Sequence, residues 1–186
     1  MRYLPLGRTG VLVSELCLGT MTFGEGWGFG GIDAEHADAI MGAALDAGIN
    51  FIDTADVYSN GDSEVLLGGA LAKGGRRDRV VLASKGLGRI GTGVNDTGLS
   101  RLYLTRACER SLQRLKTDRI DLYQIHGFDA ATPLDEVARA LEDLVRSAVP
   151  RSILVRAVKR ALNRNCKPRG SCCWAWRNSM SRRSGR

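Results

Sequence analysis

The sequence lacks the features that mark membrane-spanning, secreted or metal-binding proteins. No run of about 18 apolar residues occurs, so no transmembrane helix is predicted. The amino-terminal segment MRYLPLGRTG contains no apolar signal region, which predicts a cytoplasmic protein with no membrane partner. The five cysteines form neither a disulfide framework nor a metal-ligand spacing, so they are expected to be free thiols and no metal is predicted.

Acidic residues are absent beyond Asp143, so the chain divides into a body of mixed charge and a basic carboxyl-terminal segment. Residues 148–186 contain nine Arg and two Lys, whereas residues 1–147 contain 16 basic residues and all 20 acidic ones. We therefore predict one domain over residues 1–147 and a basic tail, disordered or helical, over residues 148–186. A basic tail is one way to bind nucleic acid, but this one carries no partner-specific motif, so no nucleic-acid partner is expected.

Strand-like and helix-like segments alternate through residues 1–147. Two apolar stretches on either side of the segment GRTG, residues 7–10, predict an amino-terminal β-hairpin. Strands are predicted at residues 16–21, 50–56, 79–85 and 119–127, each followed by an amphipathic helix. Alternation at about 30 residues per unit predicts right-handed βαβ crossovers and a parallel α/β sheet. This periodicity fits both an open doubly wound sheet and a (β/α)8 barrel.

Four reactive side chains follow the ends of these predicted strands. Asp53 lies near the end of the second strand with Tyr58 just beyond it, Lys85 ends the third, and His126 ends the fourth. The carboxyl ends of the strands of a barrel meet at one mouth, so these four residues are expected to lie together.

The four residues match the needs of carbonyl reduction. Lys85 would stabilise the phenolate of Tyr58, and Asp53 would hold Lys85 in its charged form. His126 would donate a hydrogen bond to a carbonyl oxygen that Tyr58 then protonates. No side chain donates hydride, so this chemistry requires a nicotinamide cofactor.

A glycine-rich segment offers a second interpretation of cofactor binding. Gly26, Gly28 and Gly31 fit the pattern G-x-G-x-x-G, and Asp53 follows at about the distance seen in dinucleotide-binding folds. That fingerprint opens directly from a strand, whereas residues 22–25 intervene here, so we favour a substrate loop.

The segments LCLGTM, FIDTADVYSNGDSEVLLGGAL, VVLASKG and SLQRLKTDRIDLYQIHG closely resemble the aldo-keto reductase family. The resemblance implies a TIM (β/α)8 barrel closed at its base by the hairpin. It implies NADPH-dependent reduction of a small-molecule aldehyde or ketone, with Tyr58 as general acid beside Asp53, Lys85 and His126. It also implies that the nicotinamide ribose end contacts Asp53 and the segment that comprises Gly19, Thr20 and Met21.

The resemblance ends after the segment LEDLVRS. The family continues with a strand bearing a Ser-Asn pair that holds the nicotinamide carboxamide, and no such pair follows here. The chain is shorter than the roughly 250 residues of a barrel, so only about four βα units are expected. We hypothesise a frameshift or rearrangement near residue 148, with a fused arm as the alternative. The alternative function is an inactive half-barrel without most of the cofactor site.

Overall fold

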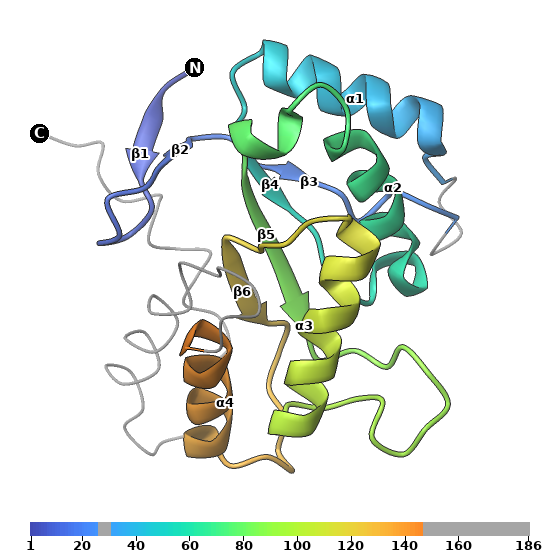
Figure 1. Ribbon diagram of the computed structural model, residues 1–186, viewed down its shortest axis with the longest axis vertical. Helices are drawn as coiled ribbons and strands as arrows, with labels where there is room; N and C mark the ends of the chain where they lie inside the picture. The colour runs from blue at the N-terminus through green and yellow to red at the C-terminus, as the bar shows by residue number, and fades with distance from the viewer. Residues whose placement is uncertain (26–30, 147–186) are drawn as a thin grey trace, which may run out of the picture.

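The computed structural model describes residues 1–25 and 31–146, which form a hairpin followed by four strand–helix units (Figure 1). Strands β1 (Tyr3–Pro5) and β2 (Leu12–Ser14) pair antiparallel. The units are β3 (Leu18–Gly19) with α1 (Ala34–Asp46), β4 (Phe51–Asp53) with α2 (Asp62–Leu71), β5 (Val81–Gly86) with α3 (Arg101–Leu115), and β6 (Leu122–Ile125) with α4 (Leu134–Arg146). Short 3-10 turns, η2 (Tyr58–Gly61) and η3 (Arg76–Arg79), precede α2 and β5.

The four strands of the second sheet are parallel and lie in the order β3-β4-β5-β6. Neighbours in the sheet are therefore successive in the chain, and each helix crosses from one strand to the next. In Figure 1 the helices follow in chain order from α1 at the top to α4 at the lower left. Among the described strands the order never reverses, as it would in a doubly wound sheet, so the barrel-type alternative is the one observed.

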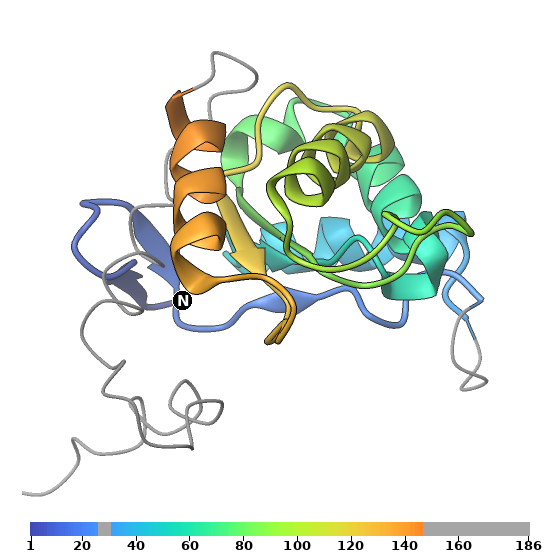
Figure 2. The same cartoon turned by 90° about the horizontal axis from the view of Figure 1, so that it is seen from below.

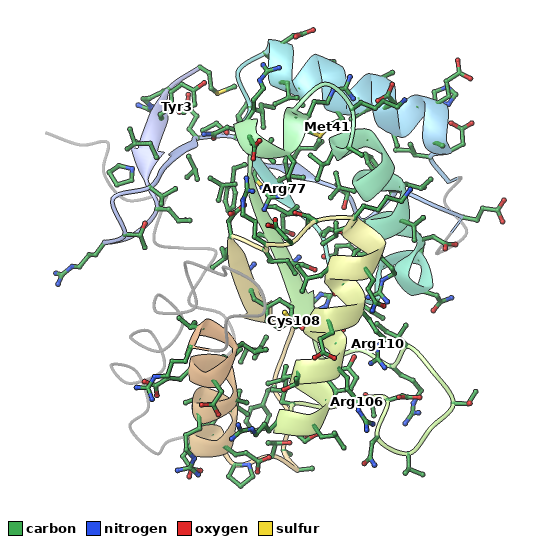
Figure 3. The ribbon with its side chains drawn as sticks, in the orientation of Figure 1. Tyr3, Met41, Arg77, Arg106, Cys108 and Arg110 are labelled. Carbon is green, nitrogen blue, oxygen red and sulfur yellow. The ribbon has the colours of Figure 1, made fainter. Side chains whose placement is uncertain are left out.

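The main hydrophobic core fills the space between this sheet and its helices. Met41 of α1 and Cys108 of α3, both labelled in Figure 3, are buried there with Ile52 of β4 and Leu82 of β5. The part of the chain that the structure describes contains no helix both long and apolar enough to cross a membrane.

The hairpin connection packs against part of the opposite face of the sheet. Side chains alternate along a strand, so Ala83 and Leu122 project away from the helices, and they pack with Leu6 and Val11 of the hairpin connection. In Figure 2 the hairpin, in dark blue, lies apart from α2 and α3. The predicted hairpin is confirmed, and it packs near the amino end of β6.

Helix α1 begins at a capping carboxylate and ends at a glycine, and one of its faces is buried against the core. The carboxylate of Asp33 caps the helix by accepting from the backbone N–H of His36, and Gly48 follows its end with φ of 83°. Ala37, Met41, Ala44 and Leu45 are buried, whereas Ala47 just beyond the helix is exposed.

The glycine pair in α2 has a packing role at one position. A Cβ on Gly68 would lie 2.5 Å from the carbonyl oxygen of Arg114, whereas one on Gly69 would meet nothing within 4 Å. Gly68 therefore allows α2 and α3 to pack backbone against backbone, which offsets its low helix propensity.

Candidate functional site

The structure brings Asp53, Tyr58, Lys85 and His126 together at the carboxyl end of the sheet. Asp53 ends β4, Lys85 is the penultimate residue of β5, and His126 directly follows β6. Tyr58 opens η2, the turn that joins β4 to α2. Three parallel strands and the turn after β4 thus bring the four side chains to one place, as the spacing predicts.

The ammonium of Lys85 hydrogen-bonds to two of the other three residues of this cluster. It donates to the Oδ1 atom of Asp53, to the carbonyl oxygen of Thr54 over 2.8 Å, and to the hydroxyl oxygen of Tyr58 over 3.2 Å. An ammonium has three N–H donors and no acceptor, so these contacts use every donor it has. The Lys85 side chain is only 14% exposed, which strengthens each of these contacts.

His126 lies against the other side of Tyr58. The two rings meet edge to face, with centroids 5.5 Å apart and planes at 81°. Burial lowers the pKa of His126 and the charge of Lys85 lowers it further, while Asp53 acts in the opposite direction. The imidazole is therefore neutral near pH 7, with one ring N–H available as a donor.

The backbone after Tyr58 is held in an uncommon conformation. Ser59 and Asn60 have φ of 48° and 55°, and Gly61 follows with φ of 101°, so three successive residues are left-handed. The hydroxyl of Ser59 donates to the carbonyl oxygen of Phe23 over 2.8 Å. This turn fixes Tyr58 at the rim and connects it to the loop after β3.

The residues predicted to bind cofactor differ in their exposure. Gly19 and Met21 are exposed and Asp53 is partly exposed, whereas Thr20 is fully buried. Gly19 is in register with Asp53, and a Cβ on Gly19 would meet nothing within 4 Å, so the face beside the carboxylate is open.

Thr20 belongs instead to a buried hydroxyl cluster behind the site. Its Oγ1 lies 2.9 Å from Oγ of Ser63, which donates to the Thr20 carbonyl oxygen over 2.7 Å and lies 3.2 Å from Oγ1 of Thr54. Sequence reasoning missed Ser63. The available signal was a serine in the first turn of α2, because a hydroxyl that is buried there needs a hydrogen-bond partner.

Gln124 is a second residue that sequence reasoning missed. Its Nε2 donates to Oδ2 of Asp53 over 3.5 Å. The spacing Gln124-x-His126 was the available signal, since residues two apart on a strand share a face.

Across the described ranges, no group of three or more His, Cys, Asp and Glu side chains is placed to hold a metal ion.

Comparison with known proteins identifies relatives of this chain. The model of the aldo/keto reductase family matches residues 15–159. The chain is 47% identical over 156 residues to the uncharacterized oxidoreductase YrpG of Bacillus subtilis, covering 79% of this chain and 46% of that protein. It is 37% identical over 153 residues to the aldo-keto reductase YhdN of the same organism, covering 82% and 46%.

A solved structure shows the same architecture. The chain matches the aldo-keto reductase AKR11C1 from Bacillus halodurans (holo form) with a TM-score of 0.72 and 38% identity, covering 88% of this chain and 54% of that one. The four strand–helix units are therefore part of a TIM (β/α)8 barrel, as predicted. The chain spans about half the length of the relatives it matches. The predicted tail, residues 148–186, lies outside the described residues.

Proposed function

This chain belongs to the aldo/keto reductase family, and we propose that it reduces a small aldehyde or ketone to the alcohol with NADPH, using Tyr58 as the proton donor. The observation that carries the proposal is the hydrogen bond from Lys85 to the hydroxyl oxygen of Tyr58. The reductase unit would be the domain over residues 1–147, acting on free small molecules in the cytoplasm.

The direction of that hydrogen bond supports proton donation by Tyr58. Because Lys85 has only donors, Tyr58 accepts in this contact, and its own hydroxyl hydrogen is left for another partner. Once the proton has been transferred, the ammonium stabilises the phenolate that remains. Asp53 accepts from the same ammonium and holds it beside Tyr58.

His126 complements Tyr58 in this proposal. A neutral imidazole whose centroid lies 5.5 Å from that of the phenol can direct its N–H toward the oxygen that Tyr58 protonates. Two donors on one carbonyl oxygen stabilise the negative charge that develops there. The lowered pKa of His126 suits it to this role, because it would polarise the oxygen while Tyr58 supplies the proton.

The open face beside Asp53 fits a flat cofactor ring. Gly19 contributes no side chain there, so Gly19, Met21 and Asp53 would hold the nicotinamide ribose end, with Thr20 supporting the rim from behind. The cofactor would supply the hydride to the carbonyl carbon. The preference for NADPH comes from the family resemblance.

The test is reduction of a reactive aromatic aldehyde by the purified chain, followed by loss of NADPH absorbance. Tyr58→Phe should lower kcat by about 100-fold or more, because it removes the general acid. Tyr3→Phe is the matched control, since Tyr3 lies in β1 and its hydroxyl donates to Gly48, and it should leave kcat unchanged.

Two results would count against the proposal. Turnover that survives Tyr58→Phe would show that another group donates the proton. A chain that neither quenches nor shifts NADPH fluorescence and shows no turnover would favour the inactive half-barrel.

A further inference from the structure

We infer that Gln124 is a positioning residue, whose side-chain amide orients the carboxylate of Asp53 so that Lys85 is held against Tyr58. Its kinetic consequence rests on the proposed function, whereas the orientation of the carboxylate is a property of the fold. Among the described residues the side chain of Gln124 hydrogen-bonds to Asp53 and not to Tyr58 or Lys85, so its effect would pass through Asp53.

Register places Gln124 beside the cluster. Gln124 of β6 pairs with Lys85 of β5, and paired residues of neighbouring strands project from the same face of a sheet. Its side chain reaches past Lys85 to Asp53 on β4, where Nε2 donates to Oδ2 over 3.5 Å. The side chain of Gln124 therefore reaches from β6 across β5 to β4.

The two oxygens of Asp53 are divided between two donors. Oδ1 accepts from Lys85 and Oδ2 accepts from Gln124. A carboxylate with a donor at each oxygen has its plane fixed, whereas one with a single donor can turn about its Cβ–Cγ bond. The contact with Gln124 thus keeps Oδ1 directed at Lys85.

The chemistry of an amide suits this position. Of the three acceptors around the ammonium of Lys85, only Asp53 carries a full charge, so a turned carboxylate would weaken the anchor that holds Lys85 near Tyr58. Gln124 offers a donor without a positive charge, so it does not compete with Lys85 for the carboxylate. An apolar side chain here would fill the space but leave Oδ2 without this donor.

His126 provides a readout that does not need turnover. Gln124 and His126 lie two residues apart, and the charges of Lys85 and Asp53 act on the imidazole in opposite directions. If loss of the Gln124 contact lets the carboxylate of Asp53 move away from Lys85 and His126, the charge of Lys85 is less compensated and the pKa of His126 falls. The chain contains only two histidines, and the other, His36, is exposed on α1, so both titrations can be followed by NMR in one sample.

The first experiment compares Gln124→Met with Gln113→Met. Methionine keeps the length of the side chain and removes the donor, and Gln113, the only other glutamine, is exposed on α3. We expect Gln124→Met to lower the NMR titration midpoint of His126 and to leave that of His36 unchanged. Gln113→Met should change neither. A His126 midpoint that is the same in Gln124→Met and wild type would overturn the inference.

The second experiment uses kinetics. Gln124→Met should lower kcat about tenfold with little change in KM for the aldehyde, because orientation rather than substrate binding is lost. Gln124→Glu should be active at low pH, where a protonated carboxyl can donate to Asp53, and lose activity as that carboxyl ionises. An active wild type with unchanged kcat in Gln124→Met would refute the inference. If wild type itself shows no turnover, the proposed function fails and the His126 titration still decides the role of Gln124.

Discussion

Burial and, after it, the charge of Lys85 lower the pKa of His126, and the ring of Tyr58 contacts both Lys85 and His126. The ammonium lies 4.9 Å from the centroid of that ring, and the imidazole centroid lies 5.5 Å from it. Tyr58, Lys85 and His126 therefore lie close enough to act on one another electrostatically. A substitution at Lys85 should be measurable as a change in the pKa of His126.

Replacing Lys85 should raise the pKa of His126. Burial is the larger cause of the lowered value and would persist in Lys85→Met, so the pKa should rise without exceeding that of an exposed histidine. Histidine NMR titration measures it, with Lys73→Met, an exposed lysine paired with Asp38, as the control. A midpoint that falls in Lys85→Met would mean that the ammonium is not the charge that His126 senses.

A largely buried ion pair near the amino ends of β5 and β6 should contribute strongly to stability. Arg77, labelled in Figure 3, donates to Oδ2 of Asp121 over 2.9 Å, and the same oxygen accepts from the backbone N–H of Leu82. The two charged side chains are 13% and 14% exposed. Arg77→Met leaves the carboxylate without its main partner and should lower the free energy of unfolding by roughly 3 kcal/mol.

Urea unfolding measures this loss. Arg106→Met on the exposed face of α3, also labelled in Figure 3, is the matched control and should change stability by less than about 0.5 kcal/mol. Equal losses in the two variants would indicate that the buried pair contributes no more than a surface arginine.

Strand ends were the most informative part of the sequence. Asp53, Lys85 and His126 could be placed together because each follows an apolar run, and parallel strands share a carboxyl end. The roles proposed for them go beyond placement and depend on the experiments above.

Contacts between strands could not be predicted from the pattern of any one strand. Gln124 meets Asp53 only because β4, β5 and β6 are neighbours in a particular register. A free cysteine often packs as a small hydrophobe, yet Cys17 is exposed, whereas its neighbour Leu18 packs against the main core. Adjacent strand residues project from opposite faces, and composition does not say which face the helices cover.

Glycine at the end of α3 should stabilise the protein. Lys116 caps this helix in the left-handed region, with φ of 52°, and it is exposed. Lys116→Gly relieves the crowding of Cβ at no cost in buried contacts, so the free energy of unfolding should rise by about 0.5–1 kcal/mol. Lys116→Ala removes the same side chain but keeps Cβ, and it should bring no gain in urea unfolding. A similar gain in both variants would assign the effect to the lysine side chain instead.

Asp56 should make stability fall as pH rises from about 4 to about 6. It is fully buried behind the site and accepts from the hydroxyl of Tyr103 over 2.9 Å. Burial raises the pKa of Asp56 from 3.8 to about 6, although the hydrogen bond from Tyr103 opposes this. Because the pKa is raised on folding, the folded state binds the extra proton between these values, and the resulting stabilisation is complete below 3.8 and lost above about 6.

Asp56→Asn removes the ionisation and keeps an acceptor for Tyr103. The free energy of unfolding of the variant should therefore not fall between about pH 4 and pH 6. At pH 8 it should exceed that of wild type by up to about 3 kcal/mol. Urea unfolding at a series of pH values measures the difference, with Asp46→Asn at the exposed end of α1 as the control that keeps the wild-type slope. Parallel pH curves for Asp56→Asn and wild type would show that the buried carboxyl does not take up a proton on folding.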